Sequence, residues 1–135
     1  MIQEYDIDNQ EEEEIYEDNP MALIVEDEKF NQEYLKNELR KIGIDSRIAT
    51  TVKEAIDAYH ELEKNFISVD VLFLDIILRD GSRGTEFLRM IRENKWMEKA
   101  MIIVMSGVDE MDIIKECHEL RCQNFIHKPI AKNTF

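Results

Sequence analysis

Short, strongly apolar runs alternate along this chain with segments whose apolar residues recur at helical spacing. The clearest runs, at 21–25, 69–74 and 101–105, are too short for helices, and their continuous apolarity is typical of strands buried on both faces. Weaker strand candidates lie at 44–49 and 124–126. Strands that alternate with helices form parallel sheets with right-handed crossovers. The sequence therefore predicts an α/β fold, a doubly wound five-stranded parallel sheet with helices on both faces.

Four segments between these strands are predicted to be helices, each with one apolar face. Gly43 is expected to cap the end of the first, and Thr51 with Glu54 predicts a capping box at the start of the second. The predicted apolar faces consist of Phe30, Tyr34, Leu35, Leu39 and Ile42; Val52, Ala55, Ile56, Tyr59 and Leu62; Phe87, Leu88 and Ile91; and Met111, Ile114 and Cys117.

The first 20 residues hold nine acidic residues and neither Lys nor Arg, which predicts a disordered tail or linker before a domain at 21–135. The net charge of −13 argues against a nucleic acid or an anionic membrane surface as a direct partner. Cys117 and Cys122 are too few for a disulfide framework, and the sequence shows no secretory or membrane-spanning run. A cytoplasmic location is expected.

Polar residues follow the predicted strands where each one ends. Glu26 and Asp27 follow the first, Asp75 ends the third, Ser106 closes the fourth and Lys128 closes the fifth. Because the carboxyl ends of parallel strands meet at one edge of a sheet, these five side chains are expected to converge. Three clustered carboxylates repel one another unless a cation lies among them, and oxygen ligands suit Mg²⁺.

A carboxylate beside a metal ion, a hydroxyl and an ammonium is typical of a phosphoryl-transfer site. The carboxylate can form an acyl phosphate, while Mg²⁺ and Lys128 neutralise charge on the transferring group. The sequence contains no Gly-rich phosphate loop of the nucleotide-binding type. The phosphoryl group is therefore expected to come from another protein or from a small donor.

From residue 21 to about residue 130, the order and spacing of these residues resemble the receiver domain of two-component response regulators. The resemblance implies the flavodoxin-like strand order 2-1-3-4-5. It implies Asp75 as phospho-acceptor, with Mg²⁺ held by Asp75, by Asp27, by Glu26 directly or through water, and by the backbone carbonyl of Ile77. The donor would be a histidine kinase or a phosphotransfer protein. A downstream protein would bind the face formed by the fourth helix and fifth strand.

The resemblance also implies roles for the residues around the acceptor. Lys128 would pair with the phosphoryl group, Ser106 would follow that group inward, and Phe125 would swing into the vacated space. Ile77 and Val108 occupy the two positions that tune phosphoryl lifetime in this family. Because neither side chain can orient an attacking water, we expect slow self-dephosphorylation. The chemistry would be limited to phosphorylation and dephosphorylation of the chain itself, without enzymatic turnover of another substrate.

Three features depart from the family pattern. Arg79 stands where the family usually has Pro, in a loop one residue longer, and Phe125 lacks the hydroxyl of a tyrosine, so any switch must work by packing. Only six residues, 130–135, follow Pro129, which is too short for the fifth helix that normally covers the sheet. An uncovered apolar sheet face is therefore expected, through which the chain could self-associate or bind a partner.

Other functions are compatible with parts of the pattern. A pseudo-receiver would keep the fold as a protein-interaction module without being phosphorylated, although a dead site has no need of all five polar residues. Haloacid dehalogenase-like phosphatases need a second acid two residues after the nucleophile, where this chain has Ile77. A flavodoxin-type flavin site is disfavoured because the acidic residues at 26–28 would repel the flavin phosphate.

Overall fold

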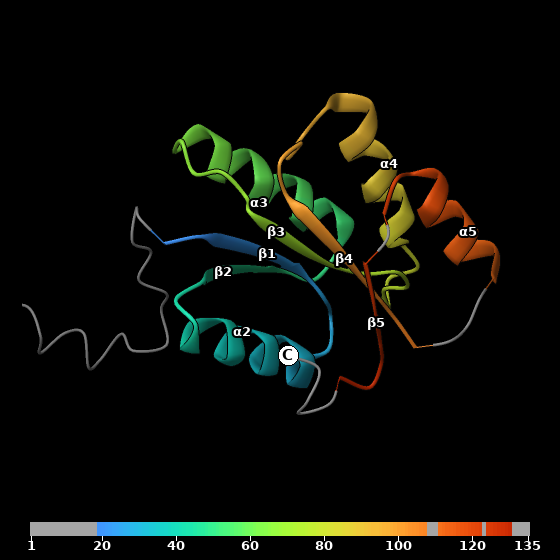
Figure 1. The fold of residues 1–135 in the computed structure, drawn as a ribbon, viewed down its shortest axis with the longest axis horizontal. Coiled ribbons are helices and arrows are strands. Elements are labelled where there is room, and N and C mark those ends of the chain that lie inside the picture. The colour runs from blue at the N-terminus through green and yellow to red at the C-terminus, as the bar shows by residue number, and fades with distance from the viewer. Residues whose placement is uncertain (1–18, 108–110, 123, 131–135) are drawn as a thin grey trace, which may run out of the picture.

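The structure is a computed structural model that describes residues 19–107, 111–122 and 124–130. Five parallel strands form one sheet in the order β2-β1-β3-β4-β5, as Figure 1 shows. The strands are β1 Met21–Val25, β2 Asp45–Ala49, β3 Val71–Asp75, β4 Met101–Ser106 and β5 Asn124–His127. This confirms the predicted α/β class and the 2-1-3-4-5 order.

Four helices connect the strands, and their labels follow Figure 1, so the fourth predicted helix is α5. The helices are α2 Lys29–Lys41, α3 Val52–Lys64, α4 Gly84–Asn94 and α5 Met111–Glu119. In Figure 1, α2 lies on one side of the sheet and α3, α4 and α5 lie on the other. The right-handed crossover rule gives this two-sided arrangement.

The sheet separates two apolar cores, and the strands contribute to both. In β1, Leu23 and Val25 face the core under α3, α4 and α5, whereas Ala22 and Ile24 face the core under α2. All five residues of β1 are buried. Burial on both sides explains why this strand is continuously apolar rather than alternating.

Two predicted helix faces were wrong in part. In α2 the buried residues are Asn31, Leu35 and Leu39, while Phe30, in its first turn, is 73% exposed and Ile42, beyond its last residue, is 67% exposed. Both exposed residues lie at the ends of the helix, outside its buried face.

The predicted face of α5 also differs from the observed one. Ile113 and Cys117 are buried there, and Ile114 is half-buried. The side chain of Met111 lies outside the described residues. The spacing that contacts the core is therefore i,i+4 rather than i,i+3.

The helix caps agree with the sequence except in one contact. Gly43 has φ +81 just after the C-cap of α2, and its N–H donates to the Arg40 carbonyl at 3.0 Å. Thr51 caps α3 by accepting from the Glu54 N–H at 3.0 Å. The Glu54 carboxylate accepts from the N–H of Thr50 at 2.8 Å, so the reciprocal half of the predicted capping box lies one residue earlier.

The sheet face that carries α2 is incompletely covered. Val71, Ile103 and Ile126 are partly buried against its core, and Met101 at the start of β4 is 56% exposed. Within the described part of the chain, no helix follows β5; residues 131–135 lie outside it. Val71, Ile103 and Ile126 are therefore only partly covered on this face, where Ile130 is buried, and the uncovered sheet face stays a prediction.

The predicted tail at 1–20 lies outside the described residues, apart from its last two, and it stays a prediction. None of the helices in the described ranges is long and apolar enough to cross a membrane.

Candidate functional site

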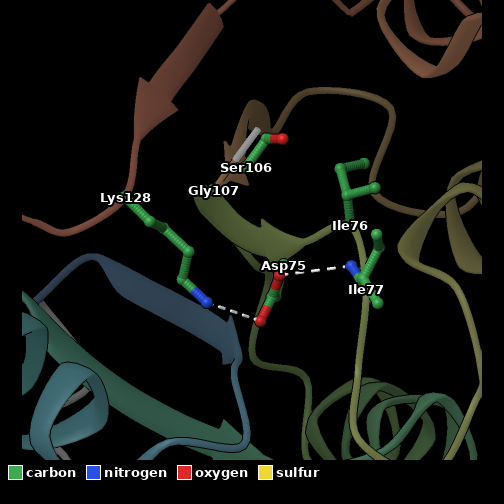
Figure 2. A pocket seen from close by; sticks show the side chains of 6 residues that line it. All are labelled: Asp75, Ile76, Ile77, Ser106, Gly107 and Lys128. Carbon is green, nitrogen blue, oxygen red and sulfur yellow. Dashed lines mark hydrogen bonds and ion pairs between the residues drawn. The ribbon is translucent and has the colours of Figure 1, made fainter. Parts of the chain in front are cut away.

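The five polar residues predicted to converge lie together at the carboxyl edge of the sheet. Glu26 and Asp27 follow β1, Asp75 ends β3, Ser106 ends β4 and Lys128 follows β5. Figure 2 shows Asp75 between Lys128 and the backbone of Ile77, with Ser106 at the end of the neighbouring strand. The parallel sheet order brings these separate segments together.

Three carboxylates form a tight cluster at this edge. Glu26, Asp27 and Asp75 each offer one carboxylate oxygen, and these oxygens lie within 4.8 Å of one another. Their proximity follows from the sheet, because Val25 of β1 is paired with Leu74 of β3 and the acids come directly after these residues. Glu26 is 0% exposed and Asp75 is also buried, whereas Asp27 is half-buried.

Lys128 supplies the positive charge that this cluster requires. Its Nζ lies 2.8 Å from Asp75 Oδ2 and 3.1 Å from Glu26 Oε1. Burial alone lowers the pKa of Lys128, but the hydrogen bond and charge of Asp75, together with Glu26, outweigh burial and raise it. The ammonium therefore stays charged and acts as an internal counter-ion.

Burial has the opposite consequence for the two acids that contact Lys128. It raises the pKa of Asp75 above its usual value, and the hydrogen bond from Lys128 opposes this only in part. The pKa of Glu26 is raised for the same reason, while the N–H of Glu28 opposes the rise. The negative charges at this edge are thus held at an energetic cost, which a bound cation would reduce.

Each carboxylate of the cluster is also held by one backbone N–H. The N–H of Glu28 donates to Glu26 Oε2 at 2.8 Å, and the N–H of Ile77 donates to Asp75 Oδ1 at 3.2 Å. The N–H of Arg79 donates to Asp27 Oδ2 at 2.5 Å. Backbone donors fix the orientation of all three groups.

The donor set fits a hard divalent cation. Glu26 Oε1 is buried, and the contact it makes among the described residues is the ion pair with Lys128 at 3.1 Å. Such an oxygen is costly unless a further positive group approaches it. Clustered carboxylate oxygens are the ligands that Mg²⁺ prefers. Ile77 lies beside Asp75, but the part played by its carbonyl stays a prediction.

A pocket of about 240 Å³ opens beside Asp75 (Figure 2). It is lined by Asp75, Ile76, Ile77, Ser106, Gly107 and Lys128. The Asp75 carboxylate, the Ser106 hydroxyl and the Lys128 ammonium thus face one small space, which suits a compact anionic group such as a phosphoryl group.

Two functional contacts were not predicted from the sequence. A Cβ atom on Gly84, the first residue of α4, would lie 2.2 Å from the backbone oxygen of Asp75, so this glycine lets α4 approach the end of β3 closely. The N–H of Arg79 on Asp27 is the second such contact. A glycine after the loop that follows β3 indicates that two backbone segments can approach closely there. Nothing in the sequence indicates that the N–H of Arg79 would donate to Asp27.

The predicted switch and lifetime residues are only partly described. Phe125 is exposed on β5, with its ring centroid 5.4 Å from that of His118 on α5. Ile77 is half exposed at the pocket. Val108 lies outside the described residues.

A parallel sheet of order 2-1-3-4-5, with three carboxylates and a lysine at its carboxyl edge, defines a receiver-type signalling domain. The chain matches the response regulator receiver domain family over residues 22–135. It belongs to that family, whose setting is two-component signalling.

Curated relatives include much longer proteins. The chain is 31% identical over 113 residues to the osmosensing histidine protein kinase SLN1 of Saccharomyces cerevisiae, covering 82% of this chain and 9% of that protein. It is 30% identical over 109 residues to a cyclic di-GMP phosphodiesterase of Thermotoga maritima, covering 81% of this chain and 27% of that one. The chain thus spans less than a third of the length of these two relatives.

Solved structures agree with the fold. A response regulator receiver protein from Pseudomonas putida superposes with a TM-score of 0.72 at 26% identity, covering 84% of this chain and 88% of that one. A CheY-like receiver domain protein from Methanospirillum hungatei gives 0.71 at 21% identity, covering 84% of each chain, and that likeness concerns the fold alone.

Proposed function

We propose that this chain is a phosphorylatable switch that accepts a phosphoryl group on Asp75 in a Mg²⁺-dependent reaction. The donor is a histidine kinase or a phosphotransfer protein. The observation that carries the proposal is the cluster of Glu26, Asp27 and Asp75 oxygens within 4.8 Å, with Lys128 hydrogen-bonded to Asp75. A structural ion pair would need one acid for one lysine, not three.

The chemistry is a displacement at phosphorus. A carboxylate oxygen of Asp75 attacks the phosphorus of a phosphohistidine, and the new O–P bond forms as the N–P bond breaks. The bonding pair stays on the imidazole nitrogen of the donor. Lys128 and the hydroxyl of Ser106 line the same pocket and would stabilise the phosphoryl oxygens. Bound Mg²⁺ would supply further charge neutralisation, with Glu26, Asp27 and Asp75 holding it.

Phosphorylation would act on the rest of the domain through charge and packing. The added group enters a pocket already lined by Ser106 and Lys128, so these residues would rearrange around it. Phe125 lies against His118 at the face formed by α5 and β5. Because Phe125 has no hydroxyl, its response would be a change of packing. A downstream protein would recognise that face.

The phosphoryl group is expected to persist. Ile77 is apolar and lies at the pocket, where it can neither orient a water nor accept its proton. The proposal is therefore one of slow self-dephosphorylation by a switch, with no turnover of another substrate. A phosphoryl half-life of seconds in Mg²⁺ would contradict it.

Intact-mass measurement tests the proposal. The native chain, Asp75→Asn and the control Asp57→Asn are each incubated with Mg²⁺ and acetyl phosphate; Asp57 is an exposed acid on α3. One phosphoryl adduct is expected on the native chain and on Asp57→Asn, none on Asp75→Asn, and none after Mg²⁺ is removed.

The main alternative is a pseudo-receiver that binds partners without being phosphorylated. It predicts a folded native chain that gains no adduct and binds no Mg²⁺. An adduct that survives Asp75→Asn would instead show that another residue is the acceptor.

A further inference from the structure

We propose that Arg79 is a positioning residue for the metal ligand Asp27, and that it acts through its backbone N–H rather than its guanidinium. The proposal rests on the Mg²⁺ site of the proposed function. It adds a residue outside the carboxylate cluster that sets how well the cluster binds the cation.

The contact itself singles out Asp27. The N–H of Arg79 donates to Asp27 Oδ2 at 2.5 Å, against 2.8 and 3.2 Å for the backbone donors to Glu26 and Asp75. Lys128 forms ion pairs with Glu26 and Asp75. Asp27 is the half-buried member of the cluster, and the structure gives its carboxylate this backbone donor from a segment 52 residues away.

The loop that presents this N–H is held by its own contacts. The N–H of Leu78 donates to the Ser82 carbonyl at 3.1 Å, and Ile77 pairs with Arg83 in an antiparallel bridge. The side chain of Leu78 is buried in the core under α3, α4 and α5. The side chain of Asp80 accepts from the N–H of Ser82 at 2.9 Å. The donor on Arg79 is therefore fixed before any cation binds.

The side chain of Arg79 contributes much less. It is 75% exposed, and its guanidinium lies 3.5 Å from Glu28 Oε2, at the limit of a hydrogen bond. Exposed ion pairs of this kind contribute little. A positive side chain near the site would also disfavour a cation slightly. Any favourable effect of Arg79 on Mg²⁺ must come from its backbone.

The backbone donor opposes a specific displacement. Repulsion from Glu26 and Asp75 favours rotation of the half-buried Asp27 carboxylate towards water. A donor on one oxygen fixes the carboxylate and leaves its other oxygen for the cation. Outer contacts of this type orient metal ligands, and their loss typically weakens metal binding about 10- to 100-fold.

Two substitutions at the same position separate backbone from side chain. Arg79→Pro removes the N–H, whereas Arg79→Ala keeps it and removes only the guanidinium. Arg83→Ala, at the other end of the loop, is the matched control for loss of one exposed positive charge. Calorimetric titration with Mg²⁺ gives the dissociation constant, and thermal unfolding in EDTA reports the fold without metal.

The family usually has Pro at this position, whereas in this chain the residue there donates its N–H to Asp27. We therefore expect Arg79→Pro to raise the dissociation constant about tenfold or more relative to the native chain, while Arg79→Ala stays close to the native value, as Arg83→Ala does. Equal affinity of Arg79→Pro and the native chain would overturn the proposal. So would an equal loss in Arg79→Ala, because the guanidinium would then be responsible.

Amide NMR of the native chain gives a second test that needs no variant and so holds even if Arg79→Pro fails to fold. The Arg79 amide should stay protected from exchange when Mg²⁺ binds. Loss of that protection on Mg²⁺ binding would show that the metal displaces the bond, which contradicts a positioning role. A native chain that binds no Mg²⁺ would refute the proposed function as well, whereas a native chain that binds while Arg79→Pro matches it refutes only this inference.

Discussion

Gly84 lets α4 approach Asp75 closely because it has no side chain. A Cβ atom there would lie 2.2 Å from the Asp75 backbone oxygen and 3.0 Å from the Leu74 side chain. Backbone cannot move aside as a flexible side chain can. The end of β3 that carries Asp75 would therefore have to shift, and with it the Asp75 carboxylate.

Gly84→Ala should lower the free energy of unfolding by about 1–3 kcal/mol, the usual range for overpacking. Gly107→Ala is the matched control, because a Cβ there would lie 3.9 Å from the Lys128 Cβ, an ordinary contact. Urea unfolding of both variants gives the comparison. If the two lose the same stability, close approach at Gly84 is not what constrains the site.

Lys128 offsets the repulsion between Glu26 and Asp75, and its loss should make stability strongly dependent on pH. The pKa of each acid is raised in the folded chain by burial, so the folded state holds these protons to higher pH than the unfolded state does. Stability from these groups is therefore present at low pH and is lost as pH rises through their folded pKa. Removing the Lys128 ammonium raises the pKa values of Glu26 and Asp75 further.

Lys128→Met should cost on the order of 3 kcal/mol at pH 8 in EDTA, the cost of leaving a buried charge unpaired, and clearly less at pH 5. Lys53→Met removes an exposed lysine that pairs with Asp57, and it should change little at either pH. Urea unfolding at the two pH values measures both. A deficit for Lys128→Met that is the same at pH 5 and pH 8 would contradict this account.

Arg92 of α4 links α4 to the segment that follows α5, in addition to the apolar contacts of the shared core. Arg92 of α4 donates from Nε to the Leu120 carbonyl at 2.8 Å and from Nη2 to the Arg121 carbonyl at 3.2 Å, just beyond the end of α5. Carbonyls at a helix C-terminus otherwise lack partners. Arg89 also forms an ion pair with Glu116 of α5, but the Arg89 side chain is half exposed and that of Glu116 is about a third exposed, so water screens the pair in part.

Arg92→Ala should therefore loosen the end of α5 by about 1 kcal/mol for each lost hydrogen bond, and Arg89→Ala should do much less. Hydrogen exchange of the α5 amides measures the difference, with the amides of β1 as an internal reference. Faster exchange throughout the sheet would mean that Arg92 stabilises the whole fold and not α5 in particular.

The strands could be predicted from this sequence more accurately than the buried faces of the helices. Burial on both sides makes β1 and β3 continuously apolar, so their pattern does not depend on which helix covers them. The buried face of a helix depends on its neighbours. Phe30 fits the helical spacing of α2 but is exposed, and in α5 the i,i+4 pair of Ile113 and Cys117 contacts the core.

The candidate site was predictable in its side chains but not in its backbone contacts. Glu26, Asp75 and Lys128 come together because the carboxyl ends of parallel strands meet at one edge, and the alternation of strands and helices predicts parallel strands. The N–H of Arg79 and the close approach at Gly84 depend on loop conformation. The polar side chains at the strand ends can be identified from the sequence. The backbone contacts cannot, because they depend on a loop conformation that only the folded chain shows.

Magnesium should stabilise the whole molecule beyond any effect of ionic strength. The chain carries a net charge of −13, so any salt reduces its self-repulsion and raises its melting temperature. A site that binds Mg²⁺ only in the folded state stabilises that state further, by about 2.7 kcal/mol when the ion is at 100 times its dissociation constant. The two contributions differ in whether they need the carboxylate cluster.

Thermal unfolding should therefore be compared in MgCl₂ and in NaCl of equal ionic strength. The native chain and Asp57→Asn, the exposed control, should melt at a higher temperature in MgCl₂, whereas Asp27→Asn should lose most of that difference. Asp27→Asn in EDTA should be at least as stable as the native chain, because removing one charge relieves repulsion within the cluster. A Mg²⁺ shift that survives Asp27→Asn would place the cation elsewhere on this acidic surface.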